Sequence, residues 1–294
     1  MNWGIGRSDY KLSSMKPYDI PISVVLPVYN GAKTIEEAVA SILRQTFQDY
    51  EFIIINDGSI DGTGKILASF KDSRIRVLNQ KNRGIAASLN RGILASRGKY
   101  IARMDADDVS LSDRFAKQLD FLEKHPSVGV VGGSTMVVYS DGTSSLRRYP
   151  ANTAIIKKNI ARISPLAHPV VMIRREVFDR VGLYDISKVG SRLLEDHDLW
   201  VRMLAAGYDM ANLPDVLMIN YRGQKSIMRK KSLNHLIKQR VSGRIEVINR
   251  LKLGYVEYLF ILPIVLLTFL NYYDIVKLDK LWNYISKRSV IFDT

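Results

Sequence analysis

The feature that most constrains the fold of this chain is a series of apolar runs that each end in polar or turn-forming residues. Four such runs occupy residues 22–30, 50–57, 75–79 and 99–105. The segments between them, at 34–47, about 62–71 and 86–96, show the apolar spacing of helices. Unbroken apolar strands that alternate with helices are typical of a parallel sheet covered by helices on both faces. Ligands of such sheets bind beyond the carboxyl ends of the strands, so we expect a binding site at loops 27–30, 56–58 and 105–108.

The second half of the chain predicts shorter elements of mixed direction. Residues 128–145 alternate between apolar and polar positions and contain an Asp-Gly turn, which is typical of an antiparallel hairpin. A strand and a short helix that ends near Gly182 are expected within 168–185, a helix over 193–208 and a last strand over 213–222. The sequence shows no internal repeat. We therefore predict an α/β fold with a mainly parallel sheet, flanking helices, a small antiparallel element and a C-terminal helical extension.

The character of the sequence changes toward its C-terminal end. We divide the chain into an N-terminal arm (1–20), a main domain (21–224) and a helical extension (225–294) that is first basic and then apolar. The apolar part, 258–270, is shorter than the roughly 20 residues that a spanning helix needs, and Pro263 interrupts it. Basic residues beside such a segment favour attachment to the surface of an anionic membrane. A helical cap on the core, or a contact between two copies of the chain, is the alternative interpretation.

The composition limits the partners and the compartment. A formal net charge of +14 and a pI near 9.8 predict an anionic partner, such as nucleic acid, anionic lipid or a phosphate-bearing substrate. The chain contains no cysteine, which excludes disulfides, zinc–thiolate sites and a cysteine nucleophile and fits a reducing compartment. The first twenty residues carry charges and lack the apolar core of a secretory signal. We therefore expect a cytoplasmic protein.

Three acidic residues stand against this positive charge, at the end of the fourth apolar run. Asp105 and Asp107 lie where the strand reaches the surface, so their carboxylates would repel each other unless a cation lies between them. Hard oxygen ligands of this kind suit Mg²⁺ or Mn²⁺, which also bind substrate phosphates. A simpler interpretation covers Asp108, because Ser110 and Asp113 resemble a capping box that opens the next helix, and an acid favours a helix start. It leaves Asp105 and Asp107 unexplained.

Four stretches of the sequence together resemble a known family. They are VVLPVYNGAKTIEEAVASILRQTF (24–47), EFIIINDGSIDGT (51–63), NRGIAASLNRGILASRGKYIARMDADD (82–108) and EDHDLWVRM (195–203). Their order and spacing resemble those of family 2 glycosyltransferases with the GT-A fold, over about residues 20–222. The resemblance implies that the main domain is a GT-A domain. It further implies transfer of a sugar from a nucleotide diphosphate sugar, with a UDP-sugar favoured, to an acceptor hydroxyl with inversion at the anomeric carbon.

The resemblance also implies roles for individual residues on the donor side. Asp107 would bind the Mg²⁺ or Mn²⁺ ion that neutralises the diphosphate, and Asp105 would contact the ribose or the metal. The nucleotide-sugar-binding residues would be Pro27 and Tyr29 beside the base, Asp57 hydrogen-bonded to the base, Arg83 and Gly84 on a nearby loop, and Asp105. Each of these residues also has a simpler interpretation when it is considered alone. Asp57 would form a turn with Gly58, Tyr29 would be an aromatic residue at the rim of the site, and Arg83 would be a solvated charge.

Inversion in a single displacement requires a base on the acceptor side. The family pattern places that base at Asp196, with Asp198 and Glu195 as the next candidates. The other interpretation of all three is an acidic first turn of a helix, which the helix dipole favours. We assign Glu195 and His168 to the acceptor side, where His168 would line the pocket or make a structural hydrogen bond. Members of the family often carry a histidine after the Tyr-Arg of the last strand, but YRGQKS stands here, so we expect no third metal ligand from that loop.

Two other functions are compatible with parts of the sequence. A nucleic-acid-binding protein would fit the charge, but the chain has no helix-turn-helix, zinc-finger or RNA-binding motif, and acids occupy the predicted crevice. A nucleotidyltransferase of the same fold would typically have a Gly-rich basic loop after the first strand, where PVYNGAKT stands instead. The expected partners are a nucleotide diphosphate sugar and a lipid-linked or oligosaccharide acceptor at the cytoplasmic face of the cell membrane. We expect no nucleic acid partner and leave a homodimer open.

Overall fold

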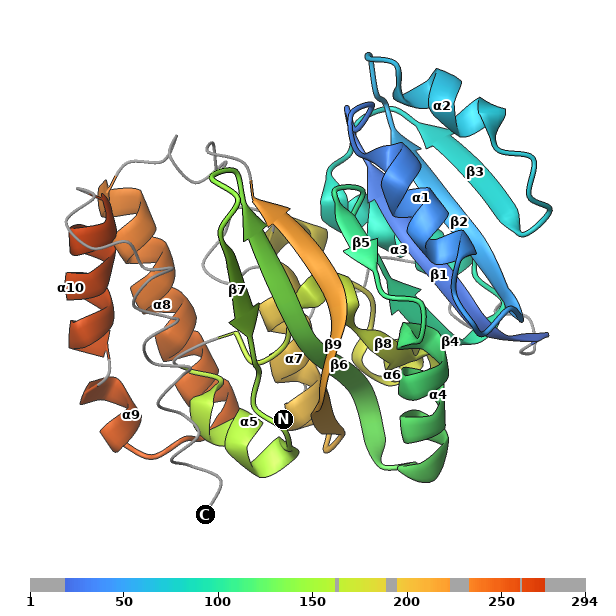
Figure 1. Cartoon of the computed structure of the whole chain (residues 1–294). Coiled ribbons are helices and arrows are strands. Elements are labelled where there is room, and N and C mark those ends of the chain that lie inside the picture. Colours follow the sequence, from blue (N-terminus) through green and yellow to red (C-terminus); the bar gives the residue numbers. More distant parts are fainter. Residues whose placement is uncertain (1–18, 162–163, 189–194, 223–232, 260, 273–294) are drawn as a thin grey trace.

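The computed structural model describes residues 19–161, 164–188, 195–222, 233–259 and 261–272. Most of the predicted N-terminal arm, and residues 225–232 and 273–294 of the predicted extension, lie outside this part of the chain. The described residues form a nine-stranded mixed sheet with helices on both faces (Figure 1). The C-terminal helices lie on the far side of the molecule from the first strands of the sheet.

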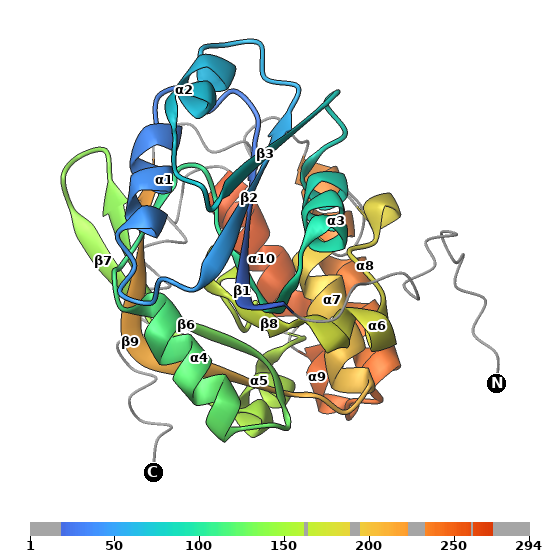
Figure 2. The same ribbon diagram turned by 90° about the vertical axis from the view of Figure 1, so that its right-hand side faces the viewer.

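The strands, in chain order, are β1 (Ile20–Val28), β2 (Tyr50–Asp57), β3 (Ile75–Gln80), β4 (Gly98–Arg103), β5 (Asp108–Ser110), β6 (Val128–Tyr139), β7 (Ser144–Arg147), β8 (Met172–Arg174) and β9 (Asp209–Arg222). The helices are α1 (Ile35–Leu43), α2 (Thr63–Ser69), α3 (Ile85–Ala95), α4 (Arg114–Lys124), α5 (Thr153–Asn159), α6 (Arg175–Val181), α7 (Glu195–Ala205), α8 (Leu233–Leu251), α9 (Val256–Leu259) and α10 (Ile261–Tyr272). The strand order in the sheet is β3-β2-β1-β4-β8-β6-β9-β5, with β7 attached to β6. Figure 2 shows α1 and α3 on opposite sides of β1 and β2.

The parallel half of the sheet confirms the predicted alternation of strands and helices. β1 pairs in parallel with β2 on one side and with β4 on the other, and β3 continues beyond β2. Alternate residues of β1 enter two different cores: Val24 and Leu26 share a core with α1, whereas Val25 shares one with α3. Both faces are buried, which explains why these strands are apolar without interruption. Because the strands run in the same direction, their carboxyl ends open onto one edge of the sheet.

The other half of the sheet holds more antiparallel pairing than a single hairpin. The predicted hairpin is confirmed, because β6 and β7 pair around the turn at Asp141 and Gly142. β8 joins β6 to β4 by antiparallel pairing on both sides, and β9 runs parallel to β6. The predicted helix after β8 forms as α6 and is followed by Gly182, whose φ of 79° suits glycine.

One local prediction is wrong, at the start of α4. Ser110 does not cap this helix, because it ends the short strand β5, which pairs with β9. α4 begins at Arg114, and the preceding Asp113 makes no capping hydrogen bond but pairs with Lys117 at 2.7 Å. Asp108, at the other end of β5, therefore belongs to the edge of the sheet and not to a helix start.

The C-terminal helices divide between the core and the surface. From α8, Val247 and Ile248 are buried in the core that also contains Trp200 of α7. On α9 and α10, in contrast, Leu259 is 73% exposed and Leu262 is 76% exposed. Within the described residues, none of the helices combines the length and the apolar character needed to cross a membrane. The extension therefore completes the core and also presents apolar side chains at the surface.

The register between β1 and β4 depends on a glycine. Gly98 begins β4 opposite Ile20, and its amide donates to Ser23 Oγ at 2.8 Å. Ser23 in turn donates to the buried Glu51 of β2 at 2.6 Å, so one side chain joins three strands. A Cβ at position 98 would lie 2.3 Å from the backbone nitrogen of Ser23. The strands would have to separate to admit it.

We predict that Gly98→Ala lowers the midpoint of thermal unfolding, because the added methyl group must push β4 away from β1. The loss of stability should be about 2 kcal/mol or more, as in other overfilled interiors. Gly64→Ala in α2 is the matched control, because a Cβ there meets Asn56 Nδ2 at 3.7 Å and alanine favours a helix over glycine. Equal midpoints for Gly98→Ala and the wild type would show that the register does not depend on this glycine.

Candidate functional site

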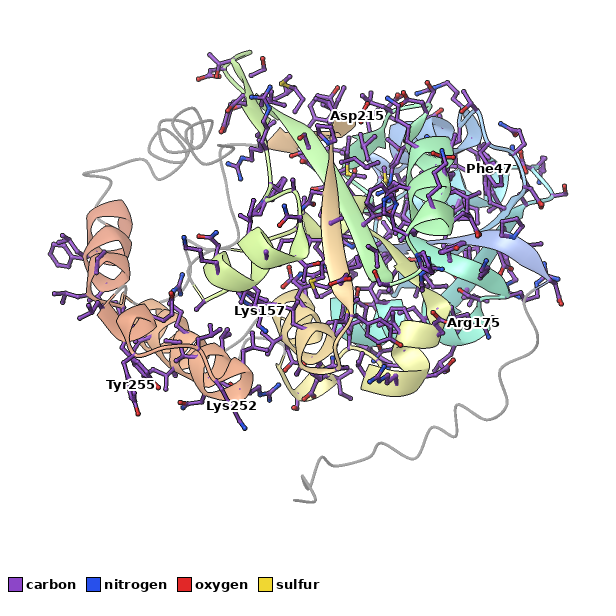
Figure 3. The ribbon with its side chains drawn as sticks, turned by 90° about the horizontal axis from the view of Figure 1, so that it is seen from below. Phe47, Lys157, Arg175, Asp215, Lys252 and Tyr255 are labelled. Atoms are coloured by element: carbon purple, nitrogen blue, oxygen red, sulfur yellow. The ribbon has the colours of Figure 1, made fainter. Side chains whose placement is uncertain are left out.

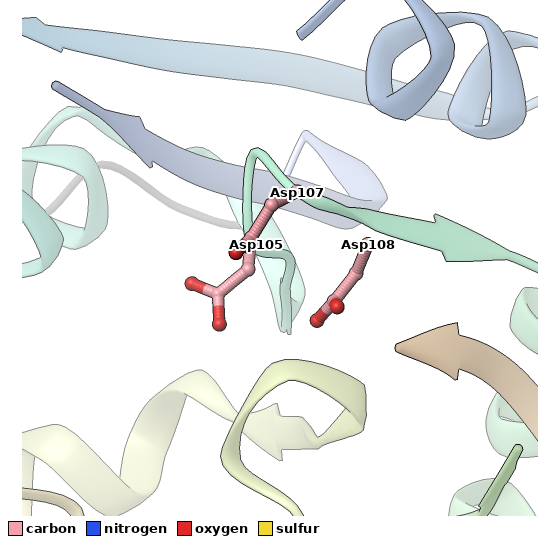
Figure 4. A group of neighbouring side chains, drawn as sticks. All are labelled: Asp105, Asp107 and Asp108. Atoms are coloured by element: carbon pink, nitrogen blue, oxygen red, sulfur yellow. The ribbon is translucent and has the colours of Figure 1, made fainter. Parts of the chain in front are cut away.

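The three acids that follow β4 gather at the edge of the sheet. β4 ends at Arg103, a short turn carries Asp105 and Asp107, and Asp108 begins β5. One carboxylate oxygen from each acid lies within 4.8 Å of those from the other two (Figure 4). Asp107 is exposed and Asp105 half-buried, whereas Asp108 is buried and accepts a hydrogen bond from the side chain of Asn220 on β9. The structure therefore adds Asp108 to the predicted pair.

The charges of this acid cluster (Asp105, Asp107 and Asp108) oppose one another. Burial and the charge of Asp105 raise the pKa of Asp108 to about 7. Desolvation of the carboxyl group by neighbouring residues, and the charge of Asp105, also raise the pKa of Asp107 above its ordinary value. Carboxylates crowded and desolvated in this way are stabilised when a cation joins them. Because its donor atoms are carboxylate oxygens, the cluster fits Mg²⁺ or Mn²⁺.

A buried arginine lies beside the acid cluster. The side chain of Arg103 is 4% exposed, and its Nη2 lies 2.7 Å from Asp105 Oδ1. Burial opposes the charge of this guanidinium, but Asp105, Tyr184 and Asp108 together raise its pKa. Arg103 was not among the residues predicted from the sequence, although a strand over 99–105, as predicted, would put positions 103 and 105 on the same side. Arg103 holds Asp105 and compensates part of the negative charge.

Asp57, at the end of β2, organises the loop that carries Arg83 and Gly84. Its Oδ1 accepts from Gln80 Nε2 at 2.6 Å and from the Arg83 amide at 2.9 Å, and its Oδ2 accepts from the Gly84 amide at 2.9 Å. A carboxylate oxygen accepts about two hydrogen bonds, so Oδ2 has one acceptor position beyond these contacts. Three of the predicted nucleotide-binding residues are thus brought together, and Asp57 has a structural duty that the sequence did not reveal.

The loop after β1 is fastened to the loop after β2 by side chains that the motifs did not single out. The Gly31 amide donates to Thr63 Oγ1 at 2.9 Å, and further hydrogen bonds join the same two loops. Gly31 also faces the acid loop, because a Cβ on it would lie 3.7 Å from Ala106 Cβ. Tyr29 is 51% exposed at this edge, whereas Pro27 is buried within β1. Of these two predicted base-contacting residues, Tyr29 is the one that presents its side chain at the surface.

His168 lies on a 3₁₀ turn before β8 and contacts two aromatic rings. Its Nε2 is hydrogen-bonded to Tyr184 Oη at 2.9 Å, and its ring packs against those of Tyr184 and Trp200. Burial and the charge of Arg103 lower the pKa of His168 well below its ordinary value, so the ring is neutral. The structural hydrogen bond, one of the two expectations for this residue, is therefore present.

Among the three acids in the first turn of α7, Asp198 is committed to ion pairs. It is buried and accepts from Arg202 Nε at 2.8 Å and from Arg250 Nη1 at 3.0 Å. Both carboxylate oxygens of Asp198 are thus occupied by hydrogen bonds from guanidinium groups. The assignment of Asp198 as a next candidate for the base stays a prediction, and the structure places this residue in ion pairs that join two helices.

Glu195 and Asp196 are half-buried in the same turn. Burial raises the pKa of both carboxyl groups above their ordinary values. Each also interacts with the charges of Arg103 and Asp105, so the start of α7 and the acid loop are neighbours. The first turn of α7 therefore lies within electrostatic range of Arg103 and Asp105.

Several known proteins are related to this chain in sequence. Residues 23–182 match the family described as Glycosyl transferase family 2. The putative glycosyltransferase EpsE of Bacillus subtilis is 32% identical over 82% of this chain and 86% of its own length. The amylovoran biosynthesis glycosyltransferase AmsE of Erwinia amylovora is 30% identical over 73% of this chain and 81% of its own length.

Two solved structures share the fold at low sequence identity. Residues 1–349 of S. aureus TarS, in complex with UDP-GlcNAc, match with a TM-score of 0.65 over 86% of this chain and 73% of that chain, at 18% identity. The mannosyltransferase PcManGT from Pyrobaculum calidifontis, in complex with GDP-Man and Mn²⁺, matches with a TM-score of 0.61 over 92% and 88%, at 19% identity. The predicted GT-A fold is thus confirmed. The sequence matches show that the chain belongs to glycosyltransferase family 2.

Proposed function

We propose that this protein transfers a sugar, with inversion, from a nucleotide diphosphate sugar to a hydroxyl of a lipid-linked saccharide during the synthesis of a cell-surface glycan. The observation that carries the proposal is that the acid cluster, with Arg103 paired to Asp105, lies within electrostatic range of the carboxylates of α7. The reaction needs both parts, because one must neutralise a diphosphate and the other must accept a proton. The relative AmsE, whose name refers to amylovoran biosynthesis, supports a glycan as the product.

The donor would lie along the carboxyl edge of the parallel strands. Tyr29 offers an aromatic ring to the base, Asp57 offers one acceptor position on Oδ2, and Arg83 and Gly84 form the loop beside it. The bound ligand of TarS, UDP-GlcNAc, supports a UDP-sugar as the donor. Pro27 would act from within β1 by shaping the strand end beneath Tyr29.

The acid cluster would hold a Mg²⁺ or Mn²⁺ ion. Bound there, the ion would neutralise the diphosphate and so make it a better leaving group. Asp107 is the exposed acid of the cluster, Asp108 is held by Asn220, and Arg103 keeps Asp105 in place. The Mn²⁺ in the PcManGT complex with GDP-Man supports this assignment.

On the acceptor side, Asp196 would be the base. As the acceptor oxygen forms its bond to the anomeric carbon, the bond from that carbon to the diphosphate breaks and the hydroxyl proton moves to the Asp196 carboxylate. A pKa raised by burial suits this duty, because it strengthens the hold of the carboxylate on the proton. Glu195 and the neutral His168, fixed by Tyr184, would line the acceptor pocket.

Nucleotide binding tests the donor side. We expect Asp107→Asn to weaken the Mg²⁺- or Mn²⁺-dependent binding of UDP by about tenfold or more, since even the partners of metal ligands contribute that much. Calorimetry with and without the ion measures the effect. Asp120→Asn, which removes an exposed acid paired with Lys124 on α4, should bind as the wild type does. Unchanged metal-dependent binding in Asp107→Asn would remove this residue from the metal site.

Transfer kinetics test the base. Asp196→Asn should bind UDP as the wild type does and lose transfer by about a hundredfold or more, because only the proton acceptor is replaced. Turnover with a nucleotide sugar and a saccharide acceptor, measured beside the same Asp120→Asn control, gives the answer. A near wild-type rate would assign the base to Glu195, because Asp198 is held by two arginines.

The exposed side chains of the C-terminal helices offer a surface for a membrane that carries the acceptor. Leu259, Leu262 and Leu266 on α9 and α10 are exposed, and Lys252 and Tyr255, between α8 and α9, point away from the sheet (Figure 3). We propose that this leucine surface (Leu259, Leu262 and Leu266) lies on an anionic leaflet at the cytoplasmic face, with basic residues adding attraction. A contact between two copies of the chain is the alternative.

The full-length protein should sediment with anionic vesicles and be released only in part by high salt, because salt screens charges but leaves apolar contacts intact. Replacing Leu259, Leu262 and Leu266 together by serine should leave the protein in the supernatant. Ile60→Ser, at an equally exposed apolar residue near α2, is the control and should sediment as the wild type does. The membrane assignment would be contradicted if the wild-type protein did not sediment with vesicles but formed a dimer in analytical ultracentrifugation, and if the triple leucine variant did not form that dimer.

A further inference from the structure

Asp198 joins α7 to the C-terminal helix α8. Its side chain is 2% exposed, and each of its oxygens faces a different arginine. Oδ2 accepts from Arg202 Nε at 2.8 Å, one turn further along α7, and Oδ1 accepts from Arg250 Nη1 at 3.0 Å, in the last turn of α8. A buried carboxylate depends on such partners, because removal of one leaves charge poorly compensated. The pairing therefore fixes the first turn of α7 against α8.

Arg202 extends this network to the segment that follows α6. Its guanidinium donates to the carbonyl oxygens of residues 181–183. The next residue, Tyr184, exchanges two hydrogen bonds through its backbone with the Asn90 side chain and holds His168 through its hydroxyl. The ion pairs of Asp198 thus connect α8, the first turn of α7 and the His168–Tyr184 pair.

α8 presents Arg250 from a packed position. Val247 and Ile248, in the same part of the helix, are buried in the core. The second nitrogen of the guanidinium, Nη2, pairs with Glu246 Oε1 at 2.7 Å, one turn earlier on α8. Arg250 is therefore held on its own helix by Glu246 and directed to Asp198 by its other nitrogen. Of the two expectations for the basic segment, a cap on the core describes this end of α8.

We propose that Asp198 and Arg250 are positioning residues of the transfer reaction, through which α8 holds the first turn of α7 and with it the Asp196 carboxylate. This inference rests on the proposed function, in which Asp196 is the base. Asp196 and Asp198 share one helical turn, so a movement of that turn displaces both. A displacement of reacting groups by about 1 Å can cost on the order of a hundredfold in rate. The C-terminal extension then belongs to the catalytic unit as well as to the attachment surface.

Two variants of Arg250 test the proposal. Arg250→Met keeps the apolar stem and removes the charge, and we expect the kcat of transfer to fall by about tenfold or more. The KM for the nucleotide sugar should not change, because the acid cluster and the loops after β1 and β2 are untouched. Arg250→Lys should recover part of the kcat. Arg44→Met, which removes an exposed ion pair with Glu37 on α1, is the matched control and should leave both constants as in the wild type.

A purely structural role of the ion pair predicts a different result, and that result would overturn the proposal. In that case Arg250→Met lowers the melting midpoint, while kcat per folded molecule stays at the wild-type value. Should Arg250→Met fail to fold, Asp198→Asn gives the same comparison, because the amide keeps the shape and one acceptor oxygen.

Asp196→Asn, measured in the same assay, separates the two hypotheses. An active Asp196→Asn contradicts the proposed base, and with it the proposed function of α7. An inactive Asp196→Asn together with an unaffected Arg250→Met contradicts the positioning role alone. Loss of kcat in both variants, with an unchanged KM for the donor and partial recovery in Arg250→Lys, supports it.

Discussion

The parallel pairing of β1 with β2 and β4 is the constraint on which the rest of the site depends. It brings the ends of three strands to one edge, where β1 delivers Tyr29, β2 delivers Asp57 and β4 delivers the acid loop. Both faces of these strands are buried, so a slip by one residue would exchange the side chains that enter the α1 core with those that enter the α3 core. The bond from Gly98 to Ser23 fixes the register at the opposite end. Backbone pairing therefore sets the positions of the donor-side groups before any of them meets a ligand.

The second constraint on the site is the set of buried positive and negative charges that the fold holds close together at this edge of the sheet. Arg103 pairs with Asp105, and a further buried arginine, Arg114, donates to the Arg103 carbonyl at 2.7 Å. Burial and the charge of Arg103 lower the pKa of Arg114 to about 9, while burial and Asp105 raise the pKa of Asp108. Groups of both signs are thus desolvated within one small region, which is costly without added counter-charges. A ligand that brings a divalent cation and a diphosphate together supplies both signs at once.

The range of each interaction along the chain decides what the sequence could predict. β1 to β4 and the helices between them were predictable because each has its own apolar period, and the acid loop was predictable because it follows β4 directly. β5 was not, since a strand of three residues has no period and forms only by pairing with β9. Ser110 and Asp113 therefore do not form the predicted capping box, and Asp108 does not lie at a helix start. The pair of Asp198 and Arg250 spans 52 residues, and nothing local marks either residue as a partner. The positions of the candidate residues at the strand ends could be predicted from the sequence, whereas the contacts that hold them could not.

In the proposed function, the C-terminal helices would bring the sheet edge and its charges close to the acceptor. Val247 is buried in the core while Leu262 is 76% exposed, so the extension has one side committed to the fold and another available to a surface. Arg250 of α8 pairs with Asp198 in the first turn of α7. A surface that binds α9 and α10 would therefore also restrict the movement of the turn that carries Asp196. A saccharide anchored in a bilayer would have lost part of its translational and rotational freedom before it meets the enzyme. The same would hold for a base whose helix is attached to that bilayer. Orientation of reactants in advance is a large part of what an enzyme contributes to a bimolecular reaction. A helical extension packed against α7, the helix of the proposed base, would supply it directly.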